Sequence, residues 1–162
     1  MLRRRMRMGV YGSLAILAQG CAEPHPDEIL SMELMDGTRI EDFAPTTGTV
    51  SVIVFDPANW LECFSGMDAW LNWKRTQEGR TIFVMTHEPT GVELRGLAIA
   101  GILPDKILRK RWTSELLPLQ ILMRAGEHPV IDVRMNRDVA YRRIAELKGH
   151  DVPSVGVTAG DS

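Results

Sequence analysis

Two apolar runs rich in β-branched residues mark the middle of the chain, at Thr49–Phe55 and Thr81–Met85. Short runs of this kind predict central strands that are covered on both faces. Between them, the stretch Phe64–Glu78 repeats its apolar residues at helical spacing and ends in polar residues before Gly79. This pattern predicts an amphipathic helix that stops at the glycine.

The same periodicity predicts further elements on either side of this unit. Asp36–Gly37 lies between alternating residues and predicts a hairpin. Thr90 and Glu93 have the spacing of a capping box, which predicts a helix to about Ile102. The other predicted elements are a short strand over 107–112, a hairpin of strands 119–123 and 130–133, and a last helix capped by Asn136 and running through Leu147. The strand–helix alternation predicts an α/β fold, with a mixed central sheet and flanking helices.

The N-terminus has the layout of a secretory signal. Its first 20 residues hold no acid. Four arginines lie within residues 3–7, a short apolar run follows over 9–18, and Cys21 comes soon after it. The end of this segment resembles a bacterial lipobox, which makes Cys21 a lipidation candidate. A cleaved signal with an incidental cysteine is the alternative. We therefore divide the chain into a signal or anchor segment (1–21), a linker (22–31), a domain (32–149) and a loose tail (150–162).

The charge balance separates this N-terminus from the body of the protein. Once the four arginines are set aside, 15 of the 19 basic residues remain against 21 acidic ones. An acidic body with a cationic tip gives no reason to expect nucleic acid and suits a membrane-directed N-terminus. The basic tip should stay in the cytoplasm by the positive-inside rule, which predicts that the body lies on the periplasmic face of a bacterial membrane.

Four features, in order along the chain, resemble the thioredoxin-like proteins that are tethered in the periplasm and reduce thiols during cytochrome maturation. They are the opening hairpin at Leu34–Gly37, the central strand Ser51–Phe55, Cys63 just after that strand, and the stretch Leu117–Gly126 with its proline, strand and glycine turn. The resemblance implies a thioredoxin-like fold in which Cys63 takes the place of the second active-site cysteine. It also implies a cis peptide bond before Pro118.

The position of the first active-site cysteine holds Trp60 instead. Thiol–disulfide exchange needs a nucleophilic thiolate and a resolving partner, so the chain lacks the family's usual chemistry. Cys63 then serves as a buried apolar residue or, as the alternative, as the one thiol of an oxidoreductase or redox sensor. Whether the protein is an enzyme stays open, with a protein that is not an enzyme as the preferred interpretation.

Other chemistry-bearing residues form no recognisable site. The four histidines have no metal-binding spacing, and we expect neither a metal nor a cofactor. His87–Glu88 follows a strand, at the end where α/β folds bind ligands, and a solvated loop is the preferred interpretation. The partner-binding candidates are the exposed loop of the fold at Trp60 and Leu61, the facing Pro118, and a basic patch with an aromatic residue formed by Arg109, Lys110, Arg111 and Trp112. A groove filled by Trp60, and a solvated strand edge at the basic patch, are the alternatives.

These observations predict a redox-inactive thioredoxin-like domain that is an accessory or structural subunit of a membrane protein complex. Its expected partners are that complex, with respiratory and photosynthetic assemblies both open, and membrane lipid at its N-terminus. A thiol oxidoreductase or redox sensor that uses Cys63 is the alternative function.

Overall fold

The computed structural model describes residues 24–76 and 81–150 of the chain. The predicted signal segment 1–21 and the tail beyond residue 150 lie outside the described residues. The described part is built on one five-stranded sheet with the order β3-β2-β1-β4-β5. These strands are β1 (Thr49–Phe55), β2 (Thr81–Met85), β3 (Lys106–Ile107), β4 (Leu119–Arg124) and β5 (Val130–Asp132).

The sheet is mixed, as the sequence predicted. β1 pairs in parallel with β2, and Phe55 lies opposite Met85. On its other side β1 pairs antiparallel with β4, which forms a hairpin with β5. The chain turns at Gly126, which has a φ of 75°. The α/β class and the predicted positions of β1, β2 and the hairpin are confirmed.

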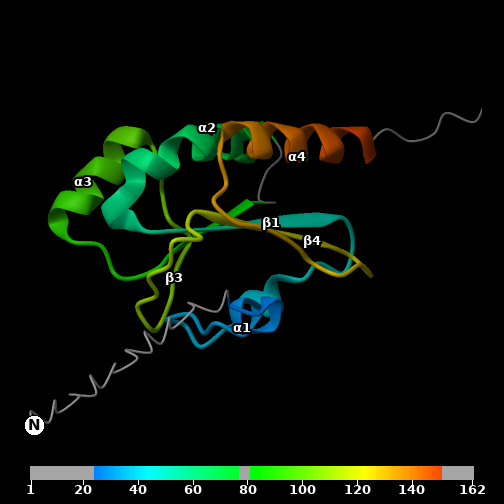
Figure 1. Cartoon of the computed structure of the whole chain (residues 1–162), viewed down its shortest axis with the longest axis horizontal. Helices are drawn as coiled ribbons and strands as arrows, with labels where there is room; N and C mark the ends of the chain where they lie inside the picture. The colour runs from blue at the N-terminus through cyan, green and yellow to red at the C-terminus, as the bar shows by residue number, and fades with distance from the viewer. Residues whose placement is uncertain (1–23, 77–80, 151–162) are drawn as a thin grey trace, which may run out of the picture.

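Three long helices cover one face of the sheet (Figure 1). They are α2 (Trp60–Thr76), α3 (Gly91–Ala100) and α4 (Arg137–His150). Because both crossovers from β1 to β2 and from β2 to β3 run in the same direction across the sheet, their helices α2 and α3 lie on the same side. The core of this layer includes Ile53, Phe55, Met67, Trp70, Phe83, Leu97 and Ile144. Its buried polar contact joins the Trp70 indole to Gln120, with Nε1 donating to Oε1 over 3.1 Å.

Short N-terminal elements cover the opposite face (Figure 1). They are α1 (Pro26–Leu30), the 3-10 helix η1 (Ile40–Phe43) and the turn between them. Ile29 is 2% exposed and packs with Leu34 and Ile40 against the strands. The linker expected over 22–31 therefore contains a helix that belongs to the core. The expectation missed this because Pro24 and Pro26 were interpreted as breakers, whereas a proline in the first turn of a helix is well tolerated.

Two other expectations need correction. The hairpin at Asp36–Gly37 is a turn closed by a single bridge from Glu33 to Arg39, and the described residues around it form no strand of their own. The strand expected over 107–112 ends at Ile107, after which Leu108 makes one bridge to Leu34. The chain leaves the sheet there because Leu108 turns to the N-terminal layer and packs among its buried residues.

The ends of the helices follow the predicted capping residues. The Thr90 hydroxyl accepts from the Glu93 backbone N–H, and the Glu93 side chain accepts from the Thr90 backbone N–H. α3 ends at Gly101, whose φ of 71° is the left-handed conformation that favours glycine. Asn136 Oδ1 accepts from the Val139 backbone N–H over 3.0 Å at the start of α4. Within 24–76 and 81–150, no helix is long and apolar enough to span a bilayer.

Candidate functional site

The carboxyl ends of β1 and β2 bring several polar side chains together. Asp56 follows β1, and Thr86 and His87 follow β2. The two ends are joined because the Thr86 backbone N–H donates to the Phe55 carbonyl over 3.0 Å. Neighbouring parallel strands end at one edge of the sheet, which is where α/β proteins commonly bind their ligands.

His87 lies between two carboxylates at this edge. Its Nδ1 is 3.8 Å from Asp56 Oδ1 and its Nε2 is 3.6 Å from Glu93 Oε1. The histidine side chain is only 12% exposed, so the expectation of a solvated loop at His87 is wrong. The three residues come from the loop after β1, the loop after β2 and the first turn of α3. The His87 ring therefore brings three elements together beside the start of α2.

Hydrogen bonding keeps the Glu93 carboxyl ionised at neutral pH. The hydrogen bond from the Thr90 backbone N–H to Glu93 Oε2, over 2.6 Å, holds the pKa of the carboxyl below its usual range. The Thr90 hydroxyl and the nearby His87 lower this pKa further, against the opposing effect of burial. Glu93 is thus a fixed negative charge next to His87 at neutral pH.

The second wall of the site is the loop before β4. The peptide bond between Leu117 and Pro118 is cis, as the resemblance implied, and Pro118 is buried. Arg134 holds this loop from the other side, since its backbone N–H donates to the Leu116 carbonyl over 2.7 Å and its Nε donates to the Glu115 carbonyl over 3.0 Å. Arg134 has a φ of 50°, a backbone conformation that non-glycine residues seldom adopt and that often marks functional loops.

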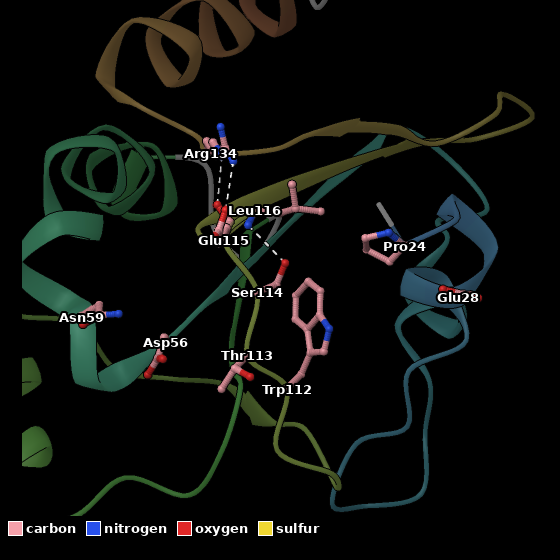
Figure 2. A pocket seen from close by; sticks show the side chains of 10 residues that line it. All are labelled: Pro24, Glu28, Asp56, Asn59, Trp112, Thr113, Ser114, Glu115, Leu116 and Arg134. Atoms are coloured by element: carbon pink, nitrogen blue, oxygen red, sulfur yellow. Dashed lines mark hydrogen bonds and ion pairs between the residues drawn. The ribbon is translucent and has the colours of Figure 1, made fainter. Parts of the chain in front are cut away.

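A groove with a cavity volume of about 850 Å³ runs between these walls. Figure 2 shows Asp56 and Asn59 on one side, Pro24 and Glu28 on the other, and the Trp112 side chain between them. Its remaining lining residues are Thr113, Ser114, Glu115, Leu116 and Arg134. With three carboxylates and one arginine, the groove is acidic, and an indole ring supplies its largest apolar surface.

Trp112 also lines a second, smaller cavity of about 440 Å³ on the N-terminal layer. Lys110 and Arg111, both exposed, line this cavity too. Arg109 instead forms an ion pair with Glu33. The residues of the predicted basic patch therefore have two different environments. Arg109 is paired with Glu33 of the N-terminal turn, whereas Lys110, Arg111 and Trp112 line the smaller cavity. Whether this surface binds a partner stays a prediction.

The loop after β1 leads through the 3-10 helix η2 (Pro57–Asn59) into α2, which begins at Trp60. The side chains of Trp60, Leu61 and Cys63 lie outside the described part of the structure, so their roles stay predictions. Asn59, the residue before Trp60, lines the larger groove, which places the start of α2 at its rim. Among the described residues, no cluster of histidine, cysteine and carboxylate side chains is arranged to hold a metal ion.

Several residues of this site were not predicted. Asp56, Glu93, Ser114, Glu115 and Arg134 were not candidates, and His87 was set aside. The sequence contained a signal for the group formed by His87, Asp56 and Glu93. Asp56 and His87 lie just after two predicted parallel strands, and Glu93 belongs to a predicted capping box. No local pattern marks Arg134, which reaches the loop before Pro118 through the pairing of β4 with β5.

Comparisons with known proteins found solved structures of low similarity. No protein-family model matches the sequence, and no curated protein matches it. An uncharacterized thioredoxin-like protein from Porphyromonas gingivalis, solved in solution, is 12% identical, with 75% of this chain and 88% of that chain covered and a TM-score of 0.46. MTB dsbF, in its mixed oxidized and reduced forms, is 13% identical, with 74% and 95% covered and a TM-score of 0.45.

The described domain has a thioredoxin-like fold, a mixed sheet with flanking helices, as the sequence predicted. The sheet order, the β4–β5 hairpin and the cis proline of the chain itself carry this assignment. The two solved structures do not bear on what this chain does.

Proposed function

We propose that this chain is a redox-inactive thioredoxin-like domain that serves as an accessory subunit of a membrane protein complex. Its N-terminal segment holds it at the periplasmic face of the membrane. The domain contributes a binding surface, and no step of electron or thiol transfer runs through it.

The observation that carries this proposal is the residue at the start of α2. The helix begins at Trp60, three residues before Cys63, which is the spacing of an active-site cysteine pair in the family that the chain resembles. An indole cannot attack a disulfide, and the chain's other cysteine, Cys21, lies in the N-terminal segment. Without a resolving thiol beside Cys63, dithiol exchange has no second half-reaction.

The acidic groove supports a binding role for the same surface. It follows the start of α2 and the loop before Pro118, and Trp112 offers a half-buried indole in its middle (Figure 2). Tryptophan is enriched among the residues that dominate protein interfaces. A partner segment in this groove would contact Trp112 and the acidic side chains at the rim, with Trp60 and Leu61 as further candidates.

A pair of substitutions tests the proposal in cells that make the complex. Cys63→Ser should leave assembly of the complex unchanged, because no thiol chemistry is needed. Trp112→Ala should weaken co-purification in mild detergent by about thirtyfold in affinity, the usual effect of truncating an interface anchor. Trp112 also packs against the N-terminal layer, so thermal melting of the isolated chain must show whether the variant is still folded.

A single-cysteine thiol enzyme predicts the opposite pattern. In that case Cys63→Ser abolishes function while the fold is retained, and the thiol of the folded protein is alkylated rapidly at neutral pH. Reaction with the alkylating agent only after denaturation supports the binding role. Normal co-purification of a folded Trp112→Ala variant would move the partner surface away from the groove.

A further inference from the structure

The outward face of α3 is apolar. Val92, Ile99 and Leu103, the last just beyond the end of the helix, are 70%, 84% and 75% exposed. Leu94 and Ala98 lie on the same outer side, while Gly96 and Leu97 turn inward and are buried. α3 therefore has apolar residues on its outer side as well as its inner side, interrupted on the outer side by Arg95, and an exposed apolar face of this kind is expected to make a further contact. Figure 1 shows α3 at one end of the helical layer, where no described element covers its outer side.

The charges around this face are predominantly basic. Arg95 lies in the middle of the outer surface, and Arg75 Nη2 reaches to 3.5 Å from the position of a Cβ on Gly101 at the end of α3. Within residues 24–76 and 81–150, neither arginine has a carboxylate partner at ion-pair distance. Glu93 is turned toward Thr90 and His87, so it does not neutralise this face. The exposed acids nearest along the chain are Asp105, which forms an ion pair with Lys74, and Glu88 in the loop before α3.

Neither a second copy of this chain nor a separate protein partner fits this face well. In a two-fold dimer the same patch meets itself, which would bring the two Arg95 side chains together at the centre. A helix of ten residues is about 15 Å long and about 10 Å wide. Its outer face by itself is much smaller than the roughly 800 Å² per partner of a specific protein interface.

A lipid surface fits both observations. Interfacial helices place apolar side chains about 5–10 Å deep at the boundary of headgroups and acyl chains, and their basic residues interact with anionic headgroups. We propose that the outer face of α3 rests on an anionic membrane surface, with Val92, Ile99 and Leu103 toward the acyl chains and Arg95 and Arg75 at the phosphates. The inference rests on the proposed membrane tether, because a patch this small needs the high local concentration that a tether supplies.

Photocrosslinking in vesicles tests the orientation directly. The full chain carries a benzophenone amino acid in place of Ile99 and is bound to vesicles of phosphatidylcholine and phosphatidylglycerol. A matched chain carries the same group in place of Val133, which is 43% exposed just after β5. Flotation measures the tether, and intact mass after irradiation measures lipid adducts. We expect adducts at position 99 and few at position 133.

The charge requirement is tested in the labelled chain by Arg95→Glu. A basic residue near an anionic membrane contributes about 1 kcal/mol, and Arg95→Glu changes the charge by two units. The ratio of membrane-bound to free orientations of α3 should therefore fall about thirtyfold. Vesicles of phosphatidylcholine alone should also give fewer adducts at position 99. Equal yields in neutral and anionic vesicles would overturn the role of the two arginines.

The remaining outcomes separate this inference from the proposed tether. A chain that floats with the vesicles but gives no lipid adduct at position 99 rejects the inference and leaves the tether standing. A chain that stays in solution without adducts rejects both. A crosslinked dimer through position 99 assigns the face to a second copy and overturns the lipid assignment.

Discussion

His87 is the residue at which three parts of the chain meet. Its ring lies between Asp56 after β1 and Glu93 in the first turn of α3, and the Thr86 hydroxyl lies 3.3 Å from Nδ1. Through these contacts the histidine connects the loop before α2 to the first turn of α3.

The ionisation of Glu93 makes part of the stability depend on pH. Because the pKa of Glu93 is lowered in the folded state, its contribution is present above the ordinary value of 4.5 and is lost as the pH falls through the lowered pKa. Glu93→Gln keeps an oxygen acceptor for the capping box but removes the negative charge at the start of α3. It should therefore cost about 0.3–1 kcal/mol at pH 7 and progressively less below about pH 4. Thermal melting across this range measures the difference.

The control for this prediction is Glu88→Gln, which removes an exposed glutamate in the loop before α3. We expect its melting temperature to follow that of the unmodified chain at each pH. A Glu93→Gln variant whose deficit stays the same from pH 7 to pH 3 would contradict the role of the charge.

Gly66 allows α2 to approach the start of α4. A Cβ added there would lie 3.2 Å from the backbone carbonyl atoms of Asn136 and the carbonyl oxygen of Met135. Backbone atoms move less readily than side chains, so Gly66→Ala should lower the melting temperature although alanine favours helix by about 1 kcal/mol. Gly91→Ala is the matched control, since its added Cβ meets nothing within 4 Å. A more stable Gly66→Ala variant would show that the two helices can separate.

At the scale of the elements, α4 depends on its first residues. Asn136 Oδ1 accepts from the Val139 backbone N–H, the typical bond of an N-cap. Asn136→Ala should cost about 1 kcal/mol of unfolding free energy, and Asn136→Asp should retain most of it. Urea denaturation of both variants measures this. Equal losses in the two variants would assign the cost to packing against α2 instead of the cap.

Elements with strong local signals were the ones that the sequence predicted well. β1 and β2 are runs of β-branched residues, and α3 begins at its capping box and ends at a left-handed glycine. α1 was missed because its stability comes from burying Ile29 against the sheet, a contact between distant parts of the chain. The strand expected over 107–112 was too long for the same reason, since Leu108 packs on the N-terminal layer.

The candidate site was less predictable than the fold. The cis bond before Pro118 followed from the resemblance, but the groove depends on Arg134 and Glu115, which meet only when β4 and β5 pair. His87 was judged from its position after a strand, and nothing in the local sequence shows that Asp56 and Glu93 enclose it. Sites assembled from several loops require the tertiary structure to be known.

At the scale of the whole molecule, the proposed membrane tether makes a prediction about the first residue of the mature chain. We expect the chain isolated from native membranes to begin either with a diacylglyceryl Cys21, after cleavage of the arginine-rich segment, or with Met1. In the second case the four arginines should stay in the cytoplasm by the positive-inside rule. Intact mass spectrometry distinguishes a lipoprotein from an uncleaved anchor. A soluble product that begins at Ala22 or later would contradict both forms of the tether.

Because α1 is packed on the sheet, it cannot serve as part of a flexible linker between the domain and a membrane anchor. Ile29 is part of the core, and the described structure already begins at Pro24. If a lipid is attached at Cys21, only three residues separate the anchor from Pro24, and a fully extended chain of that length spans about 10 Å. The domain would then lie directly at the membrane surface, because the linker is too short to let it move away. Its partners would have to present their binding surfaces within the first few nanometres above the lipid.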